Sequence, residues 1–162
     1  MAIDKEQAYA VSYHVPETEA EREELQLCWE IAFCVDLGFT EFLVGMQHEP
    51  DMWIALAVIR VLEDLRKEGE KVRLVIAWPW RDVDAKWNAK RKEMYKTIRV
   101  IADEIYYISK ESGRASHWMV DNSSRLLSDA KRYVTSDLAR ETYEYALSRL
   151  KRDVDYCIGV PD

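Results

Sequence analysis

The chain has 162 residues, a length that suits one compact domain with a substantial buried core, so we expect a single domain over residues 1–162. Its composition, 48% hydrophobic and 33% charged, is that of an ordinary globular protein. With 23 basic and 30 acidic residues the net charge is −7, which argues against direct binding to nucleic acid or to an anionic membrane surface.

The chain starts with the charged sequence MAIDKEQ, which lacks the apolar segment of a secretory signal. No apolar run approaches the roughly 20 residues needed to cross a bilayer. Three cysteines, an odd number without metal-type spacing, lie among apolar neighbours at Cys28, Cys34 and Cys157. We therefore expect a cytoplasmic protein with reduced cysteines.

The first half of the chain predicts two strands and two helices in alternation. Residues 8–14 alternate in polarity and are rich in Tyr and Val, which favours a strand. Acidic residues fill the first turns of a segment that starts at Pro16, and apolar residues at helical spacing continue it to Gly38. Residues 40–45 predict the second strand. A helix over 51–67 is apolar around most of its first half, so we expect it to be covered on more than one side.

The second half continues the alternation. Residues 71–79 form the clearest predicted strand, which Pro79 ends. A basic-faced helix over 87–102 and a strand over 104–109 follow. The remaining elements are a short helix, a weak strand, a helix and a final strand, over residues 116–122, 124–130, 135–150 and 153–159.

Strands that alternate with helices imply right-handed crossovers and a mostly parallel sheet with helices on both faces. The predicted fold class is therefore a doubly wound α/β domain. In such sheets ligands bind beyond the carboxyl ends of the strands, where the strand order reverses.

Two loops that follow predicted strands carry groups suited to a ligand. Gly45 lets a ligand approach the backbone closely, and Asp51 either contacts that ligand or caps its own helix. The segment WPWRDVDAKW, residues 78–87, combines tryptophans such as Trp80 with Arg81, a pairing that suits a planar base and a phosphate. For Trp78 we favour core packing.

A third loop, HWMVDNSS over residues 117–124, is expected at the same end of the sheet as the other two. It presents His117, Asp121, Asn122 and Ser123, which are either ligand contacts or ordinary turn formers. Its His117 is far in sequence from His14 and His48, so no zinc site is predicted. The dinucleotide-binding, Walker A and nucleophile-elbow motifs are all missing. The residues alone therefore predict an α/β domain with a small-molecule cleft and no cofactor.

Three segments together resemble the YpsA-like branch of the SLOG superfamily over about residues 40–127. They read FTEFLVGMQHEPDMWIALAV, LVIAWPWRDVDAKWNAKRKEMYKTIRVIADEIYYIS and HWMVDNSSRLL. The resemblance implies a Rossmann-like fold, a bacterial or phage origin, and a nucleotide-type ligand such as an ADP-ribose derivative at the carboxyl edge of the sheet. It carries pocket positions onto Gly45, Asp51, Trp53, Pro79, Trp87, Asp121, Asn122 and Ser123.

The chain departs from the family pattern in its two glycine-bearing loops. The segment SYHVPET keeps His14 and Pro16 but has neither the glycine nor the arginine of the family's first turn. The segment DAKRYVTSDLARET has no glycine where the family carries its phosphate loop. A helix N-terminus at Ser136 can still attract an anion through its dipole. The glycine-rich catalytic motif of the related LOG enzymes is missing as well.

These departures favour a non-catalytic protein that binds or senses a nucleotide derivative. One alternative is an interaction or assembly module such as a homo-oligomer, because six tryptophans and nine tyrosines are many for 162 residues. The other alternative is a hydrolase of nucleotide N-glycosidic bonds, for which Asp51 or Asp121 supplies the catalytic carboxylate.

Overall fold

The computed structural model describes residues 3–12, 20–46, 50–79, 88–108, 115–128 and 137–150. For residues 20–26, 50–53, 137–140 and 150 it describes the backbone alone.

Five strands and five helices alternate in the order that the sequence predicts. The strands are β1 (Ala8–Ser12), β2 (Glu41–Gly45), β3 (Arg73–Trp78), β4 (Glu104–Tyr107) and β5 (Arg125–Ser128). The helices are α1 (Ala20–Asp36), α2 (Pro50–Lys67), α3 (Ala89–Ile101), α4 (Ala115–Asp121) and α5 (Asp137–Leu150). A short 3-10 helix, η1 (Lys5–Gln7), was not predicted. The final strand that we expect over 153–159 lies outside the described residues.

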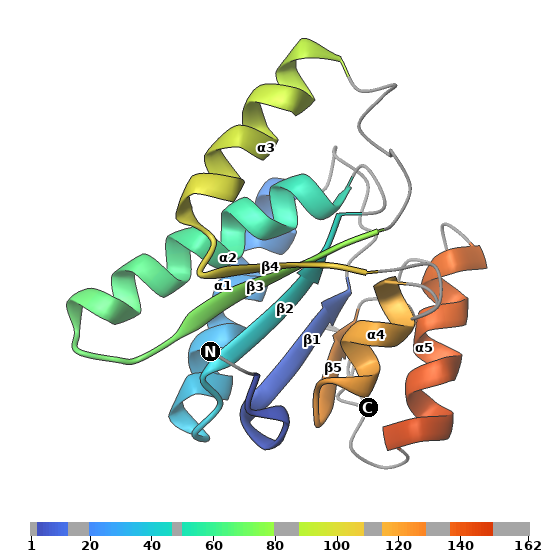
Figure 1. Ribbon diagram of the computed structural model, residues 1–162. Coiled ribbons are helices and arrows are strands. Elements are labelled where there is room, and N and C mark those ends of the chain that lie inside the picture. Colours follow the sequence, from blue (N-terminus) through green and yellow to red (C-terminus); the bar gives the residue numbers. More distant parts are fainter. Residues whose placement is uncertain are drawn as a thin grey trace.

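The five strands form one sheet in the order β4-β3-β2-β1-β5, and every pair in it is parallel (Figure 1). The chain moves outward from β1 to β4 and then returns to the other side of β1 to form β5. The strand order therefore reverses between β1 and β5, the position at which doubly wound sheets bind their ligands. The predicted α/β fold is confirmed, with a sheet that is parallel throughout.

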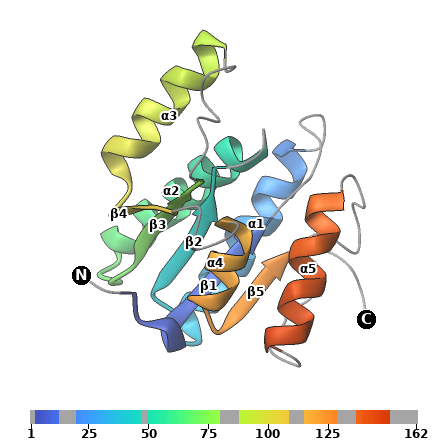
Figure 2. The same ribbon diagram turned by 45° about the vertical axis from the view of Figure 1, so that its right-hand side comes forward.

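The helices divide between the two faces of the sheet. Helices α1, α2 and α3 cover one face, here named the α1 face, with α2 in contact with both neighbours. Helices α4 and α5 cover the other, the α4 face, and Figure 2 shows them in front of the sheet with α1 and α2 behind it. Within the described ranges, no helix has the length and apolar character that crossing a membrane requires.

The two faces bury side chains of different size. On the α1 face the strands contribute large residues such as Tyr9, Phe42 and Ile76, all at most 1% exposed. On the α4 face they contribute smaller ones, including Ala10 and Ala77, which are fully buried. Because side chains alternate along a strand, one sequence supplies both faces. The small residues let α4 lie close to the sheet.

Helix α2 is apolar on several sides because it lies beneath the sheet with α1 on one side and α3 on the other. Its residues Ile54, Ala55, Ala57 and Val58 are fully buried, as predicted for this segment. The turns after α1 and α2 each contain a glycine with positive φ, Gly38 at +102° and Gly69 at +92°. L side chains rarely adopt this conformation, so these two glycines are needed for their backbone.

Candidate functional site

The carboxyl edge of the sheet, where all five strands end, is the expected place for a ligand. Strands β1, β2 and β5 end there at Ser12, Gly45 and Ser128. All three residues are buried. Strand β3 ends at Trp78, followed by the buried Pro79. Gly45 and Pro79 therefore lie at the edge to which the sequence assigned them.

Four residues at or next to the ends of neighbouring strands have small side chains and form one continuous row across the sheet. Ser128 pairs with Ser12, and Gly45 pairs with Ala77. The pair Val11 and Val44, one residue earlier, makes Ser12 and Gly45 neighbours. Each position follows a residue of the α4-face core by two, so all four belong to the α4 face. We name Ser128, Ser12, Gly45 and Ala77 the small-residue row.

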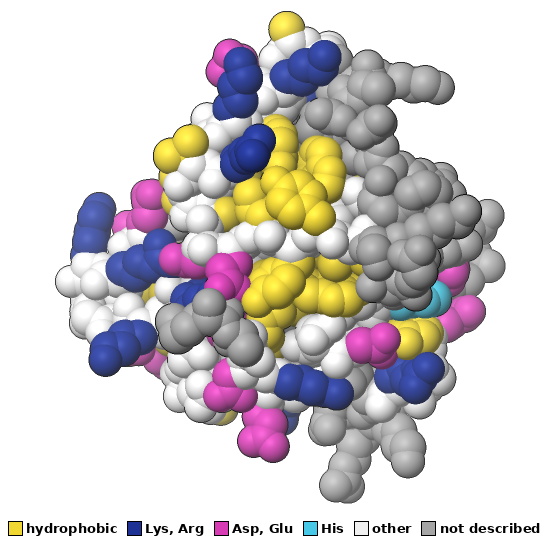
Figure 3. All heavy atoms as spheres, viewed as in Figure 1, with side chains coloured by type: hydrophobic (Ala, Val, Ile, Leu, Met, Phe, Trp, Pro, Cys, Tyr) yellow, Lys and Arg dark blue, Asp and Glu magenta, His cyan; other side chains and the backbone are white. Residues whose placement is uncertain are grey.

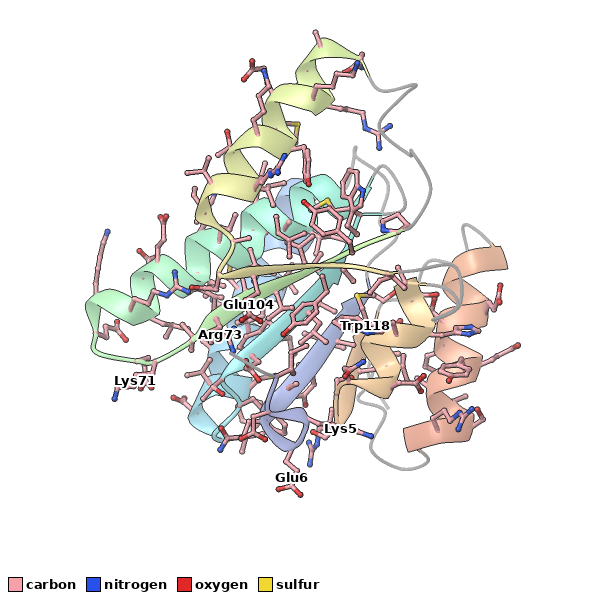
Figure 4. All side chains as sticks on the ribbon, viewed as in Figure 1. Lys5, Glu6, Lys71, Arg73, Glu104 and Trp118 are labelled. Atoms are coloured by element: carbon pink, nitrogen blue, oxygen red, sulfur yellow. The ribbon has the colours of Figure 1, made fainter. Side chains whose placement is uncertain are left out.

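An aromatic pair borders the small-residue row on the β4 side. Tyr106 pairs with Ala77 in the sheet, and its ring lies 5.1 Å from the ring of Trp118 on α4. Both side chains are half-buried and pack against the α4-face core. Figure 3 shows hydrophobic side chains gathered on this face of the molecule, and Figure 4 places Trp118 on α4 beside the sheet. A half-exposed aromatic pair offers flat surface to a planar group.

Ser116, in the first turn of α4, was not singled out from the sequence. It is 3% exposed, and its hydroxyl has no hydrogen-bond partner among the residues that the structure describes. A buried hydroxyl without a partner costs about 1–3 kcal/mol, so such groups are rare and need an explanation. No sequence pattern identifies it, because the signal is the missing partner rather than the residue type.

Trp78 has a packing role, as we favoured from the sequence. Its ring stacks on Tyr95 of α3, with centroids 4.5 Å apart and ring planes 25° from parallel. Both rings pack against the core of the α1 face. Trp78 therefore points away from the small-residue row.

Asp121, Asn122 and Ser123 do not lie at the carboxyl edge. They end α4 and lead into the first residue of β5, and Ser124 donates a backbone hydrogen bond to the carbonyl of Ala8 at the start of β1 (3.0 Å). They belong to the amino edge, the end of the sheet opposite Gly45. The expectation that all three predicted loops converge at one end of the sheet is wrong for this loop, because residues that precede a parallel strand lie at its amino end.

These three residues make local contacts at the amino edge. The amide of Asn122 donates to the carbonyl of Trp118 (2.9 Å), and the hydroxyl of Ser123 to that of Val120 (3.3 Å). Asp121 accepts a hydrogen bond from the hydroxyl of Tyr145 on α5 (2.8 Å). Burial, together with this hydrogen bond, raises the pKa of Tyr145.

A ladder of side chains joins α4 to α5. The ring of His117 stacks on that of Tyr145, 3.9 Å apart and within 4° of parallel. His117 Nε2 lies 3.6 Å from Glu141 Oε1. The guanidinium carbon of Arg149 lies over the Tyr145 ring, 5.2 Å from its centre. Glu141 is therefore part of the contact between the two helices. The ladder orients α5 on α4.

The amino edge also holds a charged network that the sequence analysis missed. Arg73 on β3 forms ion pairs with Glu41 on β2 and, at 3.0 Å, with Glu104 on β4 (Figure 4). Glu41 is 3% exposed and also accepts from the backbone N–H of Asp4. The hydroxyl of Tyr106 donates to Glu104 (2.6 Å), which raises the pKa of Tyr106. The network connects the starts of β2, β3 and β4.

Several predicted site residues cannot be compared with the structure. Asp51 and Trp53 lie in the first turn of α2, which begins beyond the carboxyl end of β2, but their side chains are not described. His14, Trp80, Arg81, Trp87 and Ser136 lie outside the described residues. Their roles in ligand binding stay predictions.

Within the described part of the chain, no group of three or more His, Cys, Asp or Glu side chains is placed to hold a metal ion. Cys34 is buried and Cys28 half-buried, and neither is in a disulfide. Burial raises the pKa of the Cys34 thiol to about 12. Cys34 is therefore a protonated core residue at neutral pH, and the third cysteine, Cys157, lies outside the described residues.

A search of curated protein sequences finds no match to this chain. The model of the YpsA family, described as the YspA SLOG family, matches residues 23–152, which cover four of the five strands and nearly all of the helical residues. This match and the parallel, doubly wound sheet agree with the resemblance seen in the three sequence segments. The chain belongs to the YpsA family of SLOG proteins.

Proposed function

We propose that this protein binds a nucleotide derivative of the ADP-ribose type at the carboxyl edge of its sheet, without catalysing a reaction. The observation that carries the proposal is the reversal of strand order between β1 and β5. Doubly wound sheets bind nucleotides outside the carboxyl ends of the strands at this position. Membership of a family with a Rossmann-like, nucleotide-related fold supports the same ligand class.

The side chains at the carboxyl edge suit such a ligand. The small-residue row leaves the strand ends of β5, β1, β2 and β3 without bulky side chains on the α4 face. The adjacent rings of Tyr106 and Trp118 offer a surface for a planar base. Small residues beside an aromatic surface are a common arrangement in nucleotide sites, since the backbone can then approach the ligand.

The absence of catalysis is proposed on the loss of the glycine-bearing loops and on the position of one of the two candidate carboxylates. Hydrolysis of an N-glycosidic bond needs a carboxylate next to the sugar. Asp121, one of the two candidates, lies at the amino edge and accepts the Tyr145 hydrogen bond. We therefore assign Asp121 a role in joining α4 to α5.

The test is titration calorimetry of the purified protein with ADP-ribose, cyclic ADP-ribose, NAD and AMP. We expect at least one of these ligands to bind in the micromolar range, with no free base released on prolonged incubation. If the folded protein gives no heat with any of the four, the proposal is wrong. If free base accumulates and the Asp51→Asn variant stops it, the protein is an enzyme.

A second candidate function, assembly with another copy of this chain, is favoured by an apolar stripe on α1. Trp29 and Phe33 on α1 and Leu37 in the turn directly after it are 74%, 59% and 53% exposed and are spaced four residues apart. Residues at this spacing share one side of a helix. Three large apolar side chains side by side on a surface are typical of an interface.

Charge supports a second copy as the partner. The sequence of α1 has five acidic residues and one basic, whereas that of α3 has five basic and one acidic. On the α1 face, α2 lies between α1 and α3. If two copies face each other across a twofold axis that runs parallel to α2, the α1 of each copy lies opposite the α3 of the other. This arrangement pairs opposite charges and covers the apolar stripe.

We expect the protein to dimerise, and the double variant Trp29→Glu/Phe33→Glu to weaken dimerisation by about 100-fold or more, because two central apolar anchors are lost. Sedimentation equilibrium measures the dissociation constant. Leu147→Glu, an exposed apolar residue of α5 on the other face (42% exposed), is the matched control and should change nothing. A wild-type protein that is monomeric at low and at high salt contradicts the assembly proposal.

A further inference from the structure

Ser116 is the serine of α4, and within the described part of the chain its hydroxyl has no hydrogen-bond partner. In a helix, residues three and four positions apart share a side. Ser116 therefore points the same way as Met119 and Val120, which pack into the α4-face core with Leu43, Val75 and Ala77. The Ser116 side chain is directed at the sheet and not at solvent.

The position of Ser116 along α4 places it over the carboxyl part of the sheet. Helix α4 begins after β4 has ended at the carboxyl edge, and it ends where β5 begins at the amino edge. Ser116 is in its first turn, and α4 packs on β2 and β3. The strand-end residues of β2 and β3 on this face are Gly45 and Ala77 of the small-residue row. An unpartnered, buried hydroxyl is thus directed at the smallest side chains of the sheet.

The surroundings of this hydroxyl are neutral. None of the described residues on the α4 face near the carboxyl edge is basic. These residues are the small-residue row, Tyr106, Ile108, Ala115 and Ser116 itself. Phosphate groups are bound by charge-assisted donors, which these residues do not supply. A serine hydroxyl both donates and accepts, which matches another hydroxyl.

We propose that Ser116 is a specificity-determining residue whose hydroxyl binds a ribose hydroxyl of the nucleotide ligand. This inference rests on the proposed function and assigns the sugar, not the phosphates, to the carboxyl part of the α4 face, next to Ser116. The hydroxyl is left without a protein partner because the ligand supplies one. Binding specificity is then achieved at a cost in the stability of the free protein.

The test is the Ser116→Ala variant with AMP, 2′-deoxy-AMP and 3′-deoxy-AMP as probes. We expect the variant to bind AMP about 3- to 10-fold more weakly than the wild-type protein, the effect of one hydrogen bond. For the wild-type protein, one of the two deoxy nucleotides should bind more weakly than AMP by a similar factor. For Ser116→Ala, this difference between AMP and the deoxy form should disappear, because the partner of that ribose hydroxyl is gone.

Thermal unfolding of the free variant gives a second readout that a structural role would not produce. Ser116→Ala should unfold at the same temperature as the wild-type protein or higher, since it removes an unsatisfied polar group. The matched control is Ser124→Ala at the amino edge, where the hydroxyl donates to the carbonyls of Glu6 (3.1 Å) and Ala8 (3.4 Å). The control should unfold at a lower temperature and bind AMP unchanged.

The outcomes separate this inference from the function on which it rests. If the wild-type protein binds neither AMP nor any other ligand of the calorimetric panel, the proposed function fails and the role of Ser116 with it. If it binds ADP-ribose and not AMP, Ser116→Ala should bind ADP-ribose about 3- to 10-fold more weakly, and equal binding contradicts the inference. If the wild-type protein binds AMP and Ser116→Ala binds it equally well, the inference alone is wrong. A deoxy effect of the same size in the wild-type protein and the variant also contradicts it.

Discussion

We expect the Arg73→Ala variant to lose about 3–5 kcal/mol of unfolding free energy, the largest loss among the substitutions considered for this fold. Arg73 neutralises Glu41, whose side chain is 4% exposed. Without the guanidinium, the buried carboxylate of Glu41 on β2 is left without its cation, and Glu104 loses its ion pair as well. Chemical denaturation in urea measures the change, with circular dichroism as the probe.

An exposed ion pair provides the control. Lys96 lies 3.5 Å from Glu93 on α3, with side chains 73% and 74% exposed, so Lys96→Ala should change stability by well under 1 kcal/mol. A further variant, Glu41→Met/Arg73→Met, replaces the pair by apolar side chains of similar length and should recover much of the loss. If Arg73→Ala is no more destabilising than Lys96→Ala, the charged network at the amino edge has no structural role.

The fold could be predicted from the sequence because each segment shows the period of its own structure. The 71–79 run is almost wholly apolar and stops at Pro79, as a strand buried on both faces does. The segment that forms α2 has apolar residues on every side of its first half, and the structure surrounds it with α1, α3 and the sheet. The alternation of such segments permits few topologies other than a parallel sheet.

The site could be predicted only in part. Residues at the end of a predicted strand were placed at the correct edge of the sheet, and residues that precede a strand were not. Gly45 and Pro79 are the last residues of predicted strands, so their place at the carboxyl edge was implied by the sequence. Asp121, Asn122 and Ser123 directly precede the strand predicted over 124–130, which implied the amino edge. We expected this loop at the same end of the sheet as Gly45 because of its polar residues, and the family resemblance agreed, whereas chain direction separates them.

Other features depend on register and packing, which the sequence does not contain. Glu41 and Arg73 lie 32 residues apart, and only the pairing of β2 with β3 makes them neighbours. The missing partner of Ser116 is visible only once α4 is packed on the sheet. Both are properties of a pair of elements and not of either segment.

The Gly45→Val substitution should abolish most of the ligand binding while leaving the protein folded. Gly45 is on β2 in the small-residue row, paired with Ala77, and it is not among the described glycines with positive φ. A β-branched side chain is therefore compatible with its backbone and favourable in a strand. The added methyl groups fill space that we assign to the ligand, at a cost of about 1–3 kcal/mol in the complex. That cost corresponds to a dissociation constant for ADP-ribose about 10- to 100-fold higher.

Gly69 provides the opposite case and serves as the control. Its φ of +92° makes Gly69→Ala strained, by about 1–2 kcal/mol, although nothing lies within 4 Å of the added Cβ. It is in the turn between α2 and β3 at the amino edge, so calorimetry should show unchanged ADP-ribose binding and urea titration a lower stability. Gly45→Ala, with one carbon added instead of three, should weaken binding less than Gly45→Val.

If Gly45→Val is folded and binds ADP-ribose as tightly as the wild-type protein, the ligand does not bind next to the small-residue row. A site on the opposite edge would then have to be considered, where the two glycine variants would reverse their effects on binding.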